Sequence, residues 1–236
     1  MTADRPVGPE VDASPASRPG PVVLDGRFGR VEKLDPAHHG AALWDAFRGD
    51  EALWTYMSQG PFAAEGAFAA WLEERARLTD PFSYAVVGAD GAALGIIALV
   101  EIRPAMRVIE VGHVLYGGAL QRTPLATEAQ YLLARYAFET LSVRRYEWKC
   151  NALNAPSRRS ALRLGFTFEG IFRQHMIVKG RNRDTAWYAM LDAEWPARRR
   201  AFERWLSLEN FDETGRQRER LNIMMAAVGH ATSHAS

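Results

Sequence analysis

The chain has 236 residues, of which 47% are apolar and 24% charged, and its formal net charge is +1. This length supports one sizeable hydrophobic core, and the balanced charge gives no reason to expect nucleic acid or an anionic membrane as a partner. The single cysteine, Cys150, excludes an internal disulfide framework and favours a reducing, cytoplasmic location, and no apolar run is long enough to predict a membrane span.

Composition divides the chain into three regions. Residues 1–21 are rich in Pro, Ala, Ser and Gly, lack the basic-then-apolar pattern of a signal peptide, and are predicted to form a disordered tail. Residues 22–195 are predicted to form one domain, in which helical and strand-like spacing alternate. Residues 196–236 are predicted to form a charged amphipathic helix with a frayed end.

The first half of the domain predicts helices followed by a run of strands. A strand with a turn at Asp25-Gly26 covers Leu24–Leu34, and Asp35-Pro36 is typical of a helix start. Helices are then expected over residues 36–47, 51–57 and 68–78. Period-two spacing predicts three consecutive strands that pair antiparallel, over Phe82–Val87, Leu94–Ile102 and Val108–Tyr116.

The second half predicts a change of strand direction. A helix over Leu125–Leu141 lies between the strands Val108–Tyr116 and Arg145–Cys150, and a strand–helix–strand unit with short connections makes its two strands parallel. A short helix and a hairpin complete the domain, over Pro156–Leu164, Phe166–Val178 and Asp184–Leu191. The predicted fold class is therefore α/β, with a mixed central sheet that is mostly antiparallel, one parallel βαβ pair, flanking helices and a C-terminal helical extension.

The segment Gln121-Arg122-Thr123-Pro124, before the long helix, is suited to an anion. Thr123 is a good N-cap and Pro124 a good first helical residue, and the N–H groups of a helix start carry partial positive charge. Arg122 can add a charge-assisted hydrogen bond to a phosphate oxygen. The loop also follows a strand of a βαβ unit, where open α/β sheets bind ligands. The alternative is a helix cap that only faces solvent.

These motifs resemble those of a known family. Gln121 to Ala126 resembles the acetyl-CoA pyrophosphate loop of the GCN5-related N-acetyltransferases, the GNAT superfamily, and residues 154–157 resemble a second cofactor-contacting segment. Over about Leu24 to Leu191 the chain is similar to the branch that acetylates N-terminal alanines of ribosomal proteins. Further motifs carry this resemblance: Thr127-Glu128-Ala129, Leu164-Gly165-Phe166, Arg183-Asp184 and Trp187-Tyr188-Ala189-Met190-Leu191. The chain departs from the family at Pro124, where the family has glycine, because proline offers no N–H to the pyrophosphate.

The resemblance implies acetyl-CoA as the co-substrate, no metal, and a primary amine as the acceptor, either a protein N-terminus or a small amine. It places the thioester beside the backbone of residues 114–116 and the pyrophosphate on the loop before the long helix. Asn154 is implied to contact the pantetheine arm, and its alternative role is to cap the next helix. The implied cofactor-binding residues are Val114, Leu115, Tyr116, Gln121, Arg122, Thr123, Pro124, Leu125, Ala126, Thr127, Asn154 and Ser157.

Two residues are candidates for catalytic proton transfer. Strand alternation predicts that Glu110 shares a face with Val114 and Tyr116 and that His113 points to the opposite face. Glu110 is expected to take the amine proton through water, unless it is only a solvated strand end. Tyr116, or else Tyr188, is expected to protonate the leaving thiolate, unless it is a packed aromatic residue.

The function expected from the sequence is an N-acetyltransferase in which the amine attacks acetyl-CoA directly within a ternary complex. Trp54-Thr55-Tyr56 is the predicted wall of the acceptor pocket. The alternative function is a non-catalytic acyl-CoA-binding or sensory module, and a homodimer is left open as the assembly.

Overall fold

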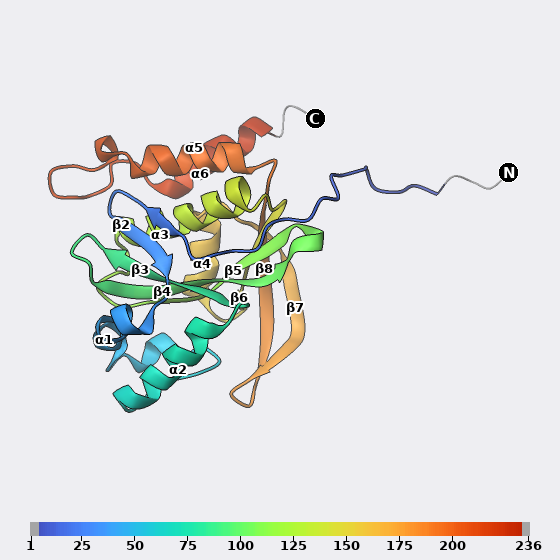
Figure 1. Cartoon of the computed structure of the whole chain (residues 1–236). Coiled ribbons are helices and arrows are strands. Elements are labelled where there is room, and N and C mark those ends of the chain that lie inside the picture. The colour runs from blue at the N-terminus through green and yellow to red at the C-terminus, as the bar shows by residue number, and fades with distance from the viewer. Residues whose placement is uncertain (1–4, 233–236) are drawn as a thin grey trace.

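One mixed sheet with helices on both faces makes up the computed structural model, which describes residues 5–232 (Figure 1). The strand order is β1-β2-β3-β4-β5-β6-β8-β7, and neighbouring strands are antiparallel except for the parallel pair β5 and β6. This arrangement confirms the predicted fold class. The strands span Val23–Asp25 (β1), Gly29–Lys33 (β2), Phe82–Gly88 (β3), Ala93–Arg103 (β4), Val108–Tyr116 (β5), Arg145–Asn151 (β6), Thr167–Val178 (β7) and Arg181–Leu191 (β8).

The helices form a layer on each face of the sheet. One face is covered by α3, α4, α5 and α6, and the other by α1 and α2 with a short 3₁₀ turn over Glu51–Trp54 (Figure 1). Each layer encloses its own cluster of buried apolar side chains, so both faces of the central strands are buried. The helices span Pro36–Phe47 (α1), Glu65–Arg77 (α2), Pro124–Arg135 (α3), Ala155–Arg163 (α4), Trp195–Leu206 (α5) and Leu221–Thr232 (α6).

The helices α3 and α4 begin with side-chain caps. The Thr123 hydroxyl accepts the Ala126 N–H at 3.2 Å, and the Asn154 side-chain oxygen accepts the Ser157 N–H at 3.1 Å. Each cap is followed within two residues by a proline, whose missing N–H would have no partner inside the helix in any case. The Thr123 cap confirms the predicted start of the long helix. The Asn154 cap confirms the alternative role predicted for Asn154, which is to cap the next helix.

A β-bulge in β5 reverses the predicted alternation of its side chains. The register between β4 and β5 shifts by one residue, and φ is +49° at His113. One extra residue turns the side chains that follow to the other face of the sheet. The prediction that Glu110 shares a face with Val114 and Tyr116, and points away from His113, is therefore wrong. The residues toward α3 are Ile109, Val111, Val114 and Tyr116, and those toward α1 and α2 are Glu110, Gly112, His113 and Leu115.

The parallel strands β5 and β6 separate before they end. Their last paired residues are Val111 and Trp148, although β5 continues to Tyr116 and β6 to Asn151. Backbone groups of β5 that point toward β6 beyond this pair have no partner in the ladder. The strands therefore open at their carboxyl ends, where sheets of this kind bind ligands.

Part of the predicted disordered tail packs against the domain. Ala16 is 8% exposed, the Ser17 N–H donates to the Leu141 carbonyl at 2.9 Å, and the Gly20 N–H donates to the Tyr136 hydroxyl at 3.0 Å. Small side chains let this backbone lie close to the domain, so its order comes from main-chain hydrogen bonds and needs little apolar bulk. The prediction of disorder is wrong for these residues, and residues 1–4 lie outside the described part.

The C-terminal region contains two helices where one was predicted. After α5, residues 207–220 form a connection that leads into α6, and α6 continues to Thr232. The two helices pack together, and α5 also packs on α3. Of the predicted frayed end, residues 233–236 lie outside the described residues.

Candidate active site

A cavity of about 1360 Å³ lies where β5 and β6 separate, between the N-terminus of α3, the helix α4 and the connection over residues 207–220. We call this cavity the groove. The side chains of Leu115 and Leu125 are absent from its lining because they are 1% and 6% exposed in the hydrophobic clusters, which leaves only their backbone groups for a ligand. The other ten predicted cofactor-binding residues line it: Val114, Tyr116, Gln121, Arg122, Thr123, Pro124, Ala126, Thr127, Asn154 and Ser157.

The loop before α3 is held by its own side chains. The Thr123 hydroxyl donates to the Leu120 carbonyl at 2.7 Å, and the Gln121 side-chain amide donates to the Tyr116 carbonyl at 2.8 Å. Arg122 has φ of +64°, and its side chain is exposed at the groove. The loop therefore presents a guanidinium group directly before the positive end of a helix, as an anion site requires.

The first turn of α3 offers fewer N–H groups than a glycine-containing loop would. Pro124 has none, and the N–H of Ala126 is already accepted by Thr123. The cap does not use the N–H of Leu125, so this N–H of the first turn remains available to a phosphate. The departure at Pro124 thus removes one donor from this end of the groove.

On the opposite wall, α4 is tied to the end of β6. The Trp148 indole N–H donates to the Ser157 hydroxyl at 3.0 Å, and both residues line the groove. Asn154 uses its side-chain oxygen for the cap of α4, so its amide nitrogen remains a donor at the same wall. Sequence reasoning did not single out Trp148, although its position at the carboxyl end of a parallel strand is a signal for a site residue.

Tyr116 is fixed by a hydrogen bond deep in the groove. Its hydroxyl accepts the Gln130 side-chain N–H at 3.1 Å. Burial raises the pKa of Tyr116 well above its usual value, so the phenol stays protonated and its own proton is available to a ligand. The side-chain oxygen of Gln130 is buried and accepts no hydrogen bond from the described residues. Tyr188, the other candidate, is 1% exposed and accepts a hydrogen bond from Arg158.

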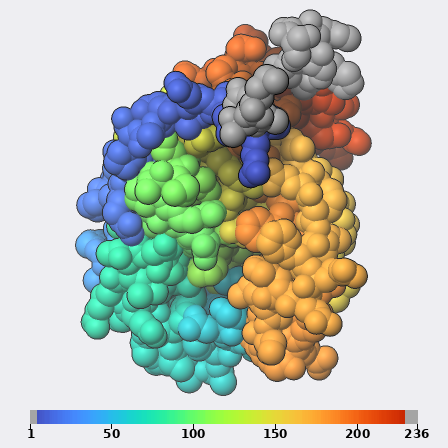
Figure 2. Space-filling view, turned by 90° about the vertical axis from the view of Figure 1, so that its right-hand side faces the viewer, coloured from blue at the N-terminus to red at the C-terminus, as the bar shows by residue number. Residues whose placement is uncertain are grey.

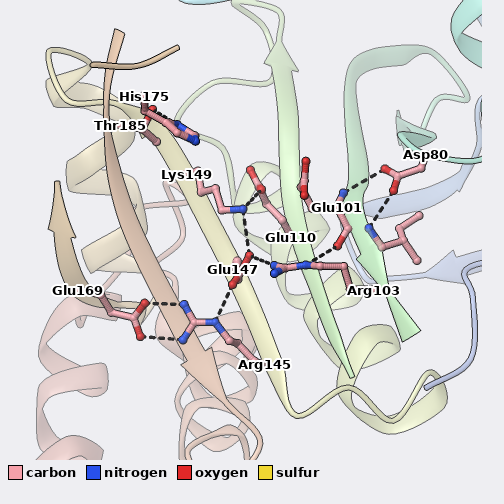
Figure 3. Close-up of polar contacts among 11 residues, drawn as sticks. Asp80, Glu101, Arg103, Glu110, Arg145, Glu147, Lys149, Glu169, His175 and Thr185 are labelled. Atoms are coloured by element: carbon pink, nitrogen blue, oxygen red, sulfur yellow. Dashed lines mark hydrogen bonds and ion pairs between the residues drawn. The ribbon is translucent and has the colours of Figure 1, made fainter. Parts of the chain in front are cut away.

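Glu110 belongs to a buried charge network on the α2 side of the sheet (Figure 3). Its carboxylate pairs with the Lys149 ammonium at 3.0 Å, and the same ammonium pairs with Glu147 at 3.0 Å. Arg103 and Arg145 also hold Glu147, at 2.5 and 2.7 Å. Glu110 is 7% exposed, so it is not a solvated strand end. Burial raises the pKa of Glu110 to about 7, and Lys149 opposes this rise.

The predicted acceptor wall is divided between the groove and the core. Tyr56 lines the groove, and its hydroxyl donates to the Leu153 carbonyl at 3.2 Å. Trp54 is 3% exposed and packs among other aromatic side chains. Its backbone carbonyl accepts a hydrogen bond from the Lys179 ammonium at 3.0 Å. Lys179 lies at the tip of the β7–β8 hairpin, which extends beyond the sheet to the level of the early helices (Figure 2). The hairpin thus meets the 3₁₀ turn at this end of the molecule.

Sequence reasoning missed the contribution of the C-terminal region to the groove. The connection over residues 207–220 was predicted as part of one helix, but it forms a groove wall next to α4. A signal was present in the alternating arginines after Gly215, which do not follow a helical spacing. The lining residues from these parts are Arg159, Arg163, Trp205, Phe211, Gly215, Arg216, Gln217, Arg218 and Arg220.

Among residues 5–232, no cluster of three or more His, Cys, Asp or Glu side chains is arranged to hold a metal ion. Within the same residues, none of the helices has the length and apolar character needed to cross a membrane.

Comparison with known proteins assigns the family. Residues 30–167 match the family model "Acetyltransferase (GNAT) domain". A GCN5-related N-acetyltransferase structure from Brucella melitensis is 44% identical with a TM-score of 0.89, covering 91% of this chain and 99% of that one. A "probable acetyltransferases (GNAT family)" structure from Chromobacterium violaceum ATCC 12472 is 41% identical with a TM-score of 0.77, covering 84% and 100%. The chain belongs to the GNAT family of acetyltransferases.

A curated relative is similar over a shorter stretch. It is the Bacillus subtilis (strain 168) protein "Putative ribosomal N-acetyltransferase YdaF", which is 31% identical over 106 residues. The match covers 45% of this chain and 57% of that protein, so the chain spans little more than half of the relative's length.

Proposed function

We propose that this chain transfers the acetyl group of acetyl-CoA to a primary amine, by direct attack of the amine within a ternary complex. The observation that carries the proposal is the groove, because it joins a capped helix N-terminus to the opening between two parallel strands inside a GNAT domain. Its volume, its arginines and the unsatisfied Gln130 oxygen fit a long, anionic ligand with amide groups. In this arrangement the pyrophosphate binds at residues 121–126.

The acetyl thioester would lie in the opening between β5 and β6. The backbone of residues 114–116 borders this opening, and groups facing β6 there have no strand partner. A fixed N–H aimed at the thioester oxygen stabilises the negative charge that develops as the amine attacks. Such donors need no reorganisation during the reaction, which is why we assign the main electrostatic contribution to the backbone.

Tyr116 is the proposed proton donor to the leaving thiolate. Its raised pKa keeps the phenol protonated, so the hydroxyl can donate a hydrogen bond to the sulfur as the C–S bond breaks. The Gln130 hydrogen bond fixes the phenol oxygen without using the proton. The side chain lies on the groove side of β5, beyond the bulge, where a thiol in the strand opening would be within reach.

Glu110 is the proposed base, acting through water from the other face of the sheet. A carboxyl with a pKa of about 7 is well matched to accept a proton near neutral pH. The amine would therefore approach from the α2 side and the acetyl group from the α3 side. The Lys149 ammonium keeps a fraction of the Glu110 carboxylate ionised at neutral pH, because it opposes the effect of burial.

The acceptor class is proposed as a protein N-terminus or a small primary amine. An α-amino group has a pKa of about 7.7–8.0 and a lysine amine about 10.4, so an N-terminus needs less help to become neutral. The printed name of the Bacillus subtilis relative refers to the ribosome, which makes N-terminal peptides of ribosomal proteins the first acceptors to test. A cytoplasmic location would fit such acceptors.

The deciding experiment measures thiol release from acetyl-CoA with a panel of amines and N-terminal peptides. Transfer above the rate without acceptor, and a product that carries one acetyl group on its amine, is the expected result. CoA binding without thiol release for every acceptor would favour the alternative, a non-catalytic acyl-CoA-binding module.

A further inference from the structure

The groove wall formed by residues 207–220 presents a row of arginines. Residues 216–220 form the irregular end of this connection, with a single bridge at Gln217 and a bend at residues 218–219. Arg216, Arg218 and Arg220 are exposed and line the groove. The two residues between them are tied to α5, because the Trp205 indole donates to Gln217 at 2.9 Å and Arg204 pairs with Glu219 at 2.5 Å. The three arginines therefore form a wall of the groove that contacts with α5 hold in place.

The positive charge of the groove is not balanced by acidic residues. Its only lining carboxylate among residues 5–232 is Asp50. None of the six lining arginines forms an ion pair with a described residue. The whole chain carries a net charge of only +1, so the excess is local and suits a multiply charged anion. The six are Arg122, Arg159, Arg163, Arg216, Arg218 and Arg220.

The backbone that carries the row is fixed before any ligand binds. The buried side chain of Asn210 donates to the Trp205 carbonyl at 3.0 Å, and the backbone carbonyl of Asn210 accepts the Arg218 N–H at 2.6 Å. The Asp212 carboxylate accepts the Arg216 N–H at 2.9 Å. These contacts lower the ordering cost that a ligand would otherwise meet on binding.

Arg163 connects the start of α3 to Trp205, the residue that holds Gln217 within the row. Arg163 of α4 donates to the Thr127 hydroxyl at 3.1 Å, in the first turns of α3. The same guanidinium lies over the Trp205 ring at 5.1 Å. Trp205 and Phe211 meet edge to face at 5.3 Å and also line the groove. Aromatic surface beside arginines is suited to a nucleobase that carries a phosphate.

We propose that Arg216, Arg218 and Arg220 bind the 3′-phosphate of the CoA adenosine, with the base against the half-buried Phe211. This inference rests on the proposed function, because it takes CoA as the ligand of the groove. The family match ends at residue 167, so these residues belong to the C-terminal region beyond the matched domain.

The test is calorimetric binding of CoA and of 3′-dephospho-CoA to the full chain. The wild-type protein is expected to bind CoA at least about tenfold more tightly than 3′-dephospho-CoA, since charged hydrogen bonds to the 3′-phosphate are lost. In the double variant Arg216→Gln/Arg218→Gln, the two affinities should approach each other. Arg200→Gln, which removes an exposed arginine of α5 outside the groove, is the matched control and should keep the wild-type ratio.

The outcomes separate this inference from the proposed function. Equal affinities of the wild-type protein for the two ligands would overturn the 3′-phosphate site and leave CoA as the ligand. An equal loss of both affinities in the double variant would also overturn it, because the arginines would then act elsewhere on CoA. Binding of neither ligand to the wild-type protein would instead refute the proposed function.

Discussion

Glu110→Gln tests both the energetics and the chemistry of the buried charge network. Burial raises the pKa of Glu110 from its ordinary 4.5 to about 7, so the folded protein binds this proton more tightly than the unfolded chain. The contribution of Glu110 to the free energy of unfolding is therefore complete below pH 4.5, and it decreases as the pH rises toward 7. The loss amounts to about 3 kcal/mol above pH 7. Glutamine cannot ionise, so the variant should gain up to about 3 kcal/mol on the wild type across this pH range.

The activity of Glu110→Gln should change in the opposite sense. Loss of the base is expected to lower turnover near neutral pH by about 10²–10⁴-fold. The deficit should shrink at higher pH, because the amine then loses its proton without help. Lys149→Met should shift the acid limb of the wild-type pH–rate profile to higher pH, since the ammonium that opposes the raised pKa of Glu110 is gone.

Urea unfolding at several pH values and pH–rate profiles with one good amine measure these two effects. Glu74→Gln is the control, because Glu74 is an exposed carboxylate on α2, and its stability change should stay within about 0.5 kcal/mol. Parallel stability curves for wild type and Glu110→Gln would refute the raised pKa. Superimposable rate profiles would remove Glu110 from the mechanism.

Three further changes test the groove and the N-terminal segment. Arg122→Ala should weaken CoA binding by about 1.5–3 kcal/mol in calorimetry, and an unchanged affinity would contradict the pyrophosphate site. Pro124→Gly should tighten CoA binding because it restores an N–H, whereas weaker binding would mean that the loop is adapted to proline. Removing residues 1–11 should leave the melting temperature unchanged, but removing residues 1–20 should lower stability by about 2 kcal/mol through its lost hydrogen bonds. Equal melting temperatures of the two truncated chains would show that the contacts of Ser17 and Gly20 contribute nothing.

Local signals made most of the fold and much of the groove predictable. The cap-and-proline pairs before α3 and α4 are read directly from Thr123 and Asn154, because capping depends on neighbouring residues. The parallel pair followed from a strand, a helix and a strand with short connections. The expected cofactor residues came from the resemblance to the acetyltransferase family, and ten of them line one cavity.

The errors arose where distant parts of the chain decide the structure. Nothing around His113 announces a positive φ, since the bulge is set by the pairing of β5 with β4. The order near Ser17 depends on a carbonyl more than a hundred residues away, at Leu141. The sequence of the connection after α5 is typical of a charged helix, but contacts with Asn210 hold it in turns and bends.

The bulge at His113 has a consequence for redesign of this protein. Because it shifts the alternation of β5 by one residue, the α2-facing positions are Glu110, Gly112, His113 and Leu115, whose side chains do not line the groove. In the proposed mechanism, substitutions there change the surroundings of the amine and leave the groove walls in place. The proposed mechanism thus assigns acceptor preference and cofactor affinity to separate sets of positions on a single strand. A library confined to the α2-facing positions other than Glu110 is expected to change the preferred acceptor and to leave the affinity for CoA near that of the wild type.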